Sequence, residues 1–345
     1  MNDEKFQLGI KNAVQVCMNV QPEDRVLVIT DEKTDRIGSA LTSESASAGA
    51  EARSVKLEEL GSRPMTEVPE SLSEIISEFL PTVTFYAADS LEGEVKMRMA
   101  LTAKIREIFN SQKQPLPRHG HMVGISDQLI REGMTADYHE INRLTLKVYD
   151  LVHGAKEIKV SAPKGTDITA QFNPDYRWVP CHGLYHQPGD WGNLPEGEVF
   201  TCPWKLDGVL VVDVLGDFFS PKYGVLENPV TIKVQDSQVA EVTCQDQKIA
   251  DEFLAYLNSA PNGLRAGEFA IGTNTSVKRL SGNLLQDEKI PGIHVAFGNP
   301  IGYQTGADWM SDVHVDVVPV QCTISVDGKT IMEDGIFLDE VLADR

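Results

Sequence analysis

Two continuous apolar segments constrain the fold of the first half of the chain most strongly. They are DRVLVIT at 24–30 and TVTFYAA at 82–88, and each is typical of a strand that is buried on both faces. Further strands are expected near 52–60 and 118–126. Helical patterns alternate with these strands at 4–19, 34–50, 68–79 and 93–110. This order predicts a parallel sheet that is covered by helices.

The second half of the chain has a different pattern. After a predicted helix at 137–154, short strand-like segments follow one another, separated by Gly, Pro and Asp turns. One helix at 246–259 interrupts them, and Asp327–Gly328 predicts a β-hairpin. We therefore predict an α/β plus β fold. Its parts are an α/β domain at 1–154 and a mostly β domain, barrel- or sandwich-like, at 155–345.

The composition excludes some kinds of partner. The 345 residues include 31 basic and 51 acidic ones, and this net charge of −20 repels phosphate backbones, so we expect no nucleic-acid partner. No run reaches the roughly 18 apolar residues of a membrane span. The five cysteines are scattered, odd in number and without a CxxC pair, which is typical of reduced thiols. We expect a cytoplasmic protein with no membrane partner.

One strand-like segment in the second half places two metal-ligand side chains together. In SDVHVDVVPV at 311–320 the valines alternate with His314 and Asp316, so these two residues lie on one face, ~7 Å apart at their Cα atoms. An imidazole and a carboxylate side by side on a rigid strand predict one corner of a metal site.

Three more residues of this kind lie in apolar surroundings, namely Glu198, Glu268 and His294. A buried lone carboxylate costs several kcal/mol unless it is paired or binds a cation. Convergence of all five residues would suit one or two Zn²⁺, Co²⁺ or Mn²⁺ ions. Taken singly, such a residue can have a purely structural explanation. His294 could be a hydrogen-bonded core residue, and Glu268 could lie in a solvated turn. Glu196 shares a strand face with Glu198 and is an alternative to it.

Other possible sites are weaker. Cys181, His182 and His186 lie in a loop without a second pair of ligands, and His119 and His121 share a strand face in the first half. The sequence contains no GxGxxG, GxxxxGK[ST] or GxSxG, so it supports neither nucleotide binding nor a serine nucleophile.

Four ordered segments resemble the dinuclear metallo-aminopeptidases of the aminopeptidase T and aminopeptidase S type. The segments are NLPEGEVFTCP, AGEFAIGTN, DEKIPGIHVAFG and VHVDVVP, with GTDITAQF ahead of them, and together they cover about 165–319. The first half of the chain is shorter than in those enzymes, and it resembles them only in its general pattern and not in specific motifs. The resemblance implies a two-metal site in the β-rich catalytic domain, and a homodimer. Its implied metal ligands are Glu198, Glu268, Glu288, His294, His314 and Asp316.

The same resemblance implies a hydrolase, specifically an aminopeptidase or other metalloprotease with zinc, cobalt or manganese. A metal-bound hydroxide would attack the carbonyl of a small peptide or amide. Glu268 or Glu288 would shuttle the proton, and Tyr303 would stabilise the oxyanion.

Two alternatives remain. The sequence is also similar to the shorter 2,5-dihydroxypyridine dioxygenases, which use one non-haem Fe(II) held by two histidines and a carboxylate. Their length fits better, but the position that matches Glu268 is histidine there, so we expect a hydrolase first. The second alternative is a non-catalytic binding or scaffold protein that keeps the fold.

Overall fold

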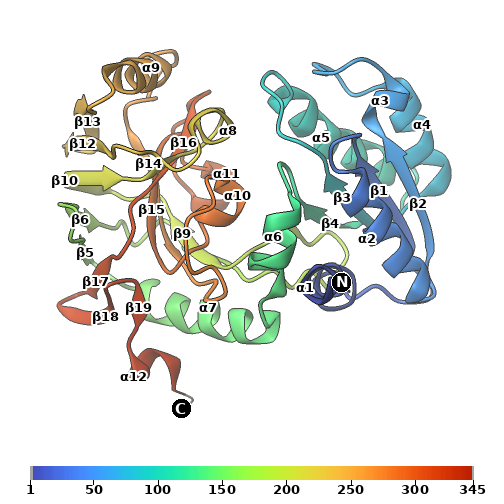
Figure 1. The fold of residues 1–345 in the computed structure, drawn as a ribbon, viewed down its shortest axis with the longest axis horizontal. Coiled ribbons are helices and arrows are strands. Elements are labelled where there is room, and N and C mark those ends of the chain that lie inside the picture. Colours follow the sequence, from blue (N-terminus) through green and yellow to red (C-terminus); the bar gives the residue numbers. More distant parts are fainter. Residues whose placement is uncertain (1–2, 344–345) are drawn as a thin grey trace. The chain divides into compact units, whose positions relative to one another are not determined.

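The computed structural model describes residues 3–343, and its chain separates into two compact units (Figure 1). Unit 1 consists of Met1–His139 and Gly183–Glu196, and unit 2 consists of Glu140–His182 and Gly197–Arg345. Each unit is described by itself below. The division into domains at 154/155 stays a prediction.

Unit 1 contains the predicted parallel sheet. Its five strands run in the order β2-β1-β3-β4-β8, and all neighbouring strands are parallel. The strands are β1 (Arg25–Thr30), β2 (Glu51–Lys56), β3 (Val83–Ala87), β4 (Arg118–His121) and β8 (Trp191–Asn193). The helices are α1 (Glu4–Lys11), the π-helix Asn12–Cys17, α2 (Asp35–Ser47), α3 (Leu57–Leu60), α4 (Glu70–Phe79), α5 (Val95–Ser111), α6 (Asp127–Arg131) and the 3₁₀ turn Gly133–Thr135.

Hydrophobic burial places the helices of unit 1 on the sheet. Leu27 and Ile29 of β1 share a buried cluster with Ile76 of α4 and Leu101 and Ile105 of α5. These residues recur at helical spacing on α4 and α5, which is why both segments fold as amphipathic helices. The strand expected at 118–126 ends at His121, and the one expected at 52–60 gives way to α3 after Lys56.

Unit 2 consists of two antiparallel sheets and confirms that the second half is mostly β. The eight-stranded sheet has the order β13-β12-β10-β6-β5-β17-β18-β19, and the six-stranded sheet has the order β11-β16-β15-β14-β9-β7. Within residues 3–343 neither sheet closes into a barrel. The first sheet contains β5 (Glu157–Ser161), β6 (Asp167–Gln171), β10 (Lys205–Val212), β12 (Val230–Gln235), β13 (Gln238–Thr243), β17 (Thr323–Val326), β18 (Lys329–Glu333) and β19 (Ile336–Phe337).

The six-stranded sheet and the helices complete unit 2. The sheet contains β7 (Val179–Cys181), β9 (Glu198–Thr201), β11 (Val214–Leu215), β14 (Ala266–Gly272), β15 (Gly292–Gly298) and β16 (His314–Val318). The helices are α7 (Tyr138–Val152, which begins in unit 1), α8 (Phe219–Tyr223), α9 (Gln247–Leu257), α10 (Leu284–Asp287), α11 (Gly302–Thr305) and α12 (Asp339–Leu342). The predicted hairpin at Asp327–Gly328 joins β17 to β18.

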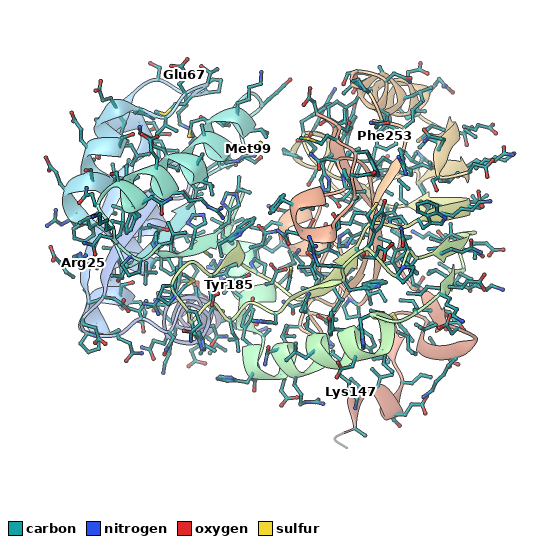
Figure 2. All side chains as sticks on the ribbon, turned by 180° about the vertical axis from the view of Figure 1, so that it is seen from behind. Arg25, Glu67, Met99, Lys147, Tyr185 and Phe253 are labelled. Carbon is teal, nitrogen blue, oxygen red and sulfur yellow. The ribbon has the colours of Figure 1, made fainter. Side chains whose placement is uncertain are left out.

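One hydrophobic core joins the two sheets of unit 2. Val160 and Leu210 from the eight-stranded sheet belong to the same buried cluster as Val295 and Val315 from the six-stranded sheet. Phe253 of α9 is also part of this cluster (Figure 2). The side chains that alternate with these core residues therefore point to the other face of the six-stranded sheet. In the described part of the chain no helix is both long and apolar enough to cross a bilayer.

Candidate metal centre

The register of three neighbouring strands brings two acidic residues into one row. Glu268 of β14 lies opposite Ala296 of β15, and Ala296 lies opposite Asp316 of β16. Residues that lie directly opposite each other share a face of the sheet. The row therefore carries a carboxylate at each end and only a methyl group in the middle, which leaves space between the two carboxylates.

Two histidines and a third carboxylate join this face from adjacent rows. His294 of β15 lies opposite Ala270 of β14, another small residue. His314 of β16 lies opposite Gly298, and Glu198 of β9 lies opposite Gly272. Each ligand-type side chain thus has glycine or alanine opposite it on one neighbouring strand, and Glu198 has Cys181 opposite it on the other.

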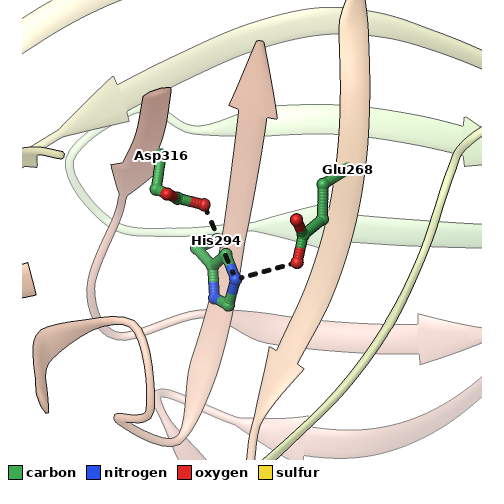
Figure 3. A group of neighbouring side chains, drawn as sticks. All are labelled: Glu268, His294 and Asp316. Carbon is green, nitrogen blue, oxygen red and sulfur yellow. Dashed lines mark ion pairs between the residues drawn. The ribbon is translucent and has the colours of Figure 1, made fainter. Parts of the chain in front are cut away.

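The polar ends of Glu268, His294 and Asp316 converge (Figure 3). One ligand atom each from Glu268, His294 and Asp316 lie within 4.8 Å of one another, and all three residues are buried. His294 Nε2 lies 3.5 Å from Glu268 Oε1, 3.8 Å from Asp316 Oδ1 and 3.5 Å from Glu198 Oε2. His314 Nε2 lies 3.6 Å from an oxygen of both Glu268 and Asp316. Three of the six predicted metal ligands therefore share one point, and Glu198 and His314 each contact members of this group.

Backbone carbonyls fix the orientation of both imidazole rings. His294 Nδ1 lies 3.0 Å from the carbonyl oxygen of Glu288, and His314 Nδ1 lies 2.9 Å from that of Asn299. A carbonyl only accepts hydrogen bonds, so each Nδ1 carries a proton. Each Nε2 then faces the carboxylates, which is the arrangement that metal-binding histidines have in proteins.

The pKa values reflect the crowding of negative charge. Burial by itself lowers the pKa of His294, but the hydrogen bond with Glu268 and the charges of Glu198 and Asp316 raise it to about 10. Burial likewise opposes the charged form of His314, and the charges of Asp316 and Glu268 outweigh it and raise its pKa. The carboxylates therefore favour positive charge at both rings, and a bound divalent cation would balance the same negative charge.

Glu288, the sixth predicted ligand, lies at the edge of this cluster and contacts a residue that the sequence did not single out. Its Oε1 lies 2.8 Å from the Nζ atom of Lys289, which also lies 2.8 Å from Glu198 Oε2. Burial raises the pKa of Glu288 to about 8, although the charge of Lys289 lowers it. The signal for Lys289 is its place in DEKIPGIH, where a lysine directly follows an acidic residue and precedes a buried strand.

Tyr303 and Glu196 lie in different surroundings. Tyr303 is 71% exposed, and its hydroxyl accepts a hydrogen bond from the Gln304 amide at 2.9 Å. Glu196 is buried in unit 1, where Oε2 accepts from the Tyr185 hydroxyl and from the backbone N–H of Asn193, both at 3.2 Å. The structure thus does not bring Tyr303 into the buried cluster. Its role in catalysis stays a prediction.

The alternative clusters do not gather as metal sites. Cys181 and His182 belong to unit 2, whereas His186 belongs to unit 1, where its Nε2 lies 2.8 Å from the carbonyl oxygen of Val16. His119 and His121 contact each other through ring nitrogens 3.3 Å apart, and Nδ1 of His119 lies 2.8 Å from the Thr84 hydroxyl. Burial lowers the pKa of both rings, so they form a neutral pair.

The residues present fit a divalent cation. Carboxylates and imidazoles are the ligands that Fe²⁺, Mn²⁺, Co²⁺ and Zn²⁺ share. Two of the carboxylates, Glu268 and Asp316, have no lysine or arginine among their ion-pair partners in the described chain. A bound ion would therefore supply the charge that the protein leaves unmatched there.

Comparison with known proteins agrees with this fold. The chain has a TM-score of 0.70 and 16% identity to a 2,5-dihydroxypyridine dioxygenase from Pseudomonas putida KT2440, covering 98% of both chains. It has the same TM-score and identity to wild-type AmpT from Thermus thermophilus, covering 98% of this chain and 100% of that one. No curated protein sequence matches. The family model for 2,5-dihydroxypyridine 5,6-dioxygenase (NicX) matches residues 7–339. Because this match spans nearly the whole sequence, the chain belongs to the 2,5-dihydroxypyridine 5,6-dioxygenase family.

Proposed function

We propose that this protein is a non-haem Fe(II) dioxygenase that opens a hydroxylated pyridine ring. The observation that carries the proposal is the family match over residues 7–339. The expectation of an aminopeptidase rested partly on Glu268, which stands where the dioxygenases have histidine. The family match favours the dioxygenase, which was the alternative above.

The geometry of the cluster supports this proposal despite Glu268. His294 and His314 both direct Nε2 towards Asp316, at 3.8 and 3.6 Å from its two carboxylate oxygens. Two imidazoles and one carboxylate are the set that non-haem Fe(II) oxygenases use. His294 therefore supplies the second imidazole, and Glu268 adds a further carboxylate beside it at 3.5 Å.

In this proposal each residue has a distinct task. His294, His314 and Asp316 hold the ion, and a bound Fe(II) supplies the chemistry of dioxygen. The side chain of His314 is 33% exposed, whereas those of His294, Glu268 and Asp316 are at most 7% exposed, so the substrate approaches from the side of His314. Glu268, next to the histidines, accepts the proton of a ring hydroxyl as the substrate binds.

The second candidate is a metal-dependent hydrolase that cleaves a small peptide or amide. The observation in its favour is the surplus of carboxylates, because Glu198 contacts His294 and Glu288 lies at the edge of the cluster, next to Lys289. Zinc, cobalt or manganese would serve this function. The homodimer that the aminopeptidase resemblance implies stays a prediction in either case.

One experiment separates the candidates. The purified chain is loaded with Fe(II) without air, and oxygen consumption is measured after adding 2,5-dihydroxypyridine, beside release of amino acid from an aminoacyl amide with Zn²⁺, Co²⁺ or Mn²⁺. The dioxygenase predicts oxygen uptake that disappears in His314→Ala, and no amide cleavage. Amide cleavage without oxygen uptake would establish the hydrolase. If a correctly folded, metal-loaded chain showed neither activity, the binding or scaffold alternative would replace both.

A further inference from the structure

Lys289 places a fixed positive charge inside the acidic cluster. Its side chain is 1% exposed, and it belongs to the largest fully buried side chains of the protein. Burial of a lysine is rare unless the ammonium is paired, because the charge loses its hydration. Here Nζ lies 2.8 Å from an oxygen of Glu198 and 2.8 Å from an oxygen of Glu288, so the ammonium bridges two carboxylates.

The backbone holds Lys289 in this position. Its N–H donates to the carbonyl of Gln286 at 2.9 Å, and its own carbonyl accepts from the N–H of Asn274 at 3.0 Å. Lys289 lies in the short segment between α10 and β15, the strand that carries His294. The ammonium is therefore positioned by the same segment that orients His294 through the Glu288 carbonyl.

The carboxylates of the cluster divide between two cation positions. Glu268 and Asp316 face both histidines, and one divalent ion there balances their two charges. Glu198 and Glu288 face Lys289. Glu198 Oε2 also lies 3.5 Å from His294 Nε2, so the ammonium of Lys289 lies beside the first cation position. A second metal ion that shared ligands with the first would have to bind at the place of this ammonium.

We propose that Lys289 occupies the second cation position, so that the centre binds one divalent ion and not two. This inference rests on the proposed metal site and deepens it, because it explains how a nearly complete two-metal ligand set serves a one-metal enzyme. A second divalent ion would have to displace the ammonium from Glu198 and Glu288 and would be repelled by it at short range.

Metal stoichiometry tests this inference without any assay of activity. The full chain is stripped with a chelator and dialysed against Mn²⁺, an ion that prefers oxygen and imidazole ligands over the five cysteines. Bound Mn²⁺ per chain is measured by mass spectrometry of the elements, and the electron paramagnetic resonance spectrum shows whether two ions are coupled. The wild type is expected to bind one uncoupled ion.

Lys289→Met is the informative variant because methionine keeps an unbranched apolar side chain and removes the charge. It is expected to bind two Mn²⁺ per chain with a coupled spectrum, a twofold rise, and Lys289→Met with Glu198→Gln is expected to return to one. The control is Lys164→Met, which removes another lysine that pairs with a buried carboxylate, Asp213, and should stay at one.

The outcomes separate this inference from the proposed function. Two ions in the wild type would overturn the role of Lys289 while leaving the metal site intact, and this result needs no variant to fold. A folded Lys289→Met that binds one ion would also overturn it. No ion in the folded wild type would instead defeat the metal site itself.

Discussion

Ala296 lies directly opposite both Asp316 and Glu268 on the two neighbouring strands, so only a methyl group occupies the middle of this row. Both neighbours of Ala296 in this row are buried carboxylates. The space for a cation in this sheet therefore depends on a small residue at a position that is not itself a ligand.

Ala296→Val is expected to prevent metal binding. The added methyl groups fill the space between Glu268 and Asp316 and overpack the sheet, which costs about 1–3 kcal/mol of stability. Ala170→Val is the control, since Ala170 is equally buried in β6 of the other sheet. Both variants should lose stability in urea unfolding, but Ala296→Val alone should lose metal in equilibrium dialysis. Unchanged metal affinity in Ala296→Val would show that the ion binds elsewhere.

His314→Ala is expected to abolish activity and weaken metal binding while leaving the fold intact. The imidazole is one-third exposed, so its loss leaves no closed cavity in the core. Metal content, oxygen uptake and the thermal midpoint are measured together. His153→Ala, on the exposed surface of the same unit, should change none of them. Full turnover in His314→Ala would remove this residue from the site.

Glu268→His distinguishes the one-metal from the two-metal account. Histidine at this position restores the pattern of the dioxygenases that the sequence resembles and can accept a proton in place of Glu268, so we expect Fe(II) binding and ring opening to persist in the variant. Amide hydrolysis on a two-metal site should instead fall by at least about tenfold, because a ligand and proton acceptor is lost. Loss of all oxygen uptake in Glu268→His would show that the carboxylate itself is required for the dioxygenase reaction.

A separate network of buried charges stabilises unit 1. Arg63 contacts Asp31, and its Nε and Nη2 atoms contact the two oxygens of Glu94 at 2.9 and 2.6 Å. The side chains of both acids are fully buried. Arg63→Met leaves these carboxylates without their cation and is expected to cost about 3–5 kcal/mol at pH 7. Lys104→Met, which breaks an exposed pair with Glu107, should cost less than about 1 kcal/mol in the same urea titrations.

The same network predicts how stability depends on pH. Burial alone would raise the pKa of Asp31 and of Glu94, but hydrogen bonds from Thr34, Asp89 and Arg63 to the first, and from Arg63 and Met65 to the second, hold both pKa values below the ordinary range. Groups with a lowered folded pKa stabilise the protein above their unfolded pKa, and this contribution is lost as the pH falls through the folded pKa. The deficit of Arg63→Met in unfolding free energy should therefore be largest at pH 7 and shrink towards pH 3. A deficit that grows in acid would contradict this assignment.

Periodicity identified most elements of both units because burial imposes it directly. The apolar segments at 24–30 and 82–88 became β1 and β3, and the helix expected at 246–259 became α9. The prediction did not include Ala266–Gly272 as a strand, because Glu268 interrupts its apolar pattern. Glu268 departs from the continuous apolar pattern of a buried strand because its side chain faces the polar cluster.

The residue types in the cluster of ligand-type side chains were predictable, but the strand order that brings them together was not. His314 and Asp316 share a face because strands alternate, which the sequence alone shows. The order of β16, β15, β14 and β9 in the sheet was not predictable, because long-range pairing leaves no local signal. The bridge from Lys289 to Glu198 spans two distant segments and depends on that order.

The most direct test of the metal centre is a crystal structure of the protein loaded with Mn²⁺, with an anomalous difference map collected near the manganese absorption edge. Our account predicts one strong peak on the face of the six-stranded sheet, within bonding distance of Glu268 or Asp316 and of His294 or His314, with Lys289 still between Glu198 and Glu288. A map with no peak at these residues, from a protein that binds manganese elsewhere or not at all, would contradict it.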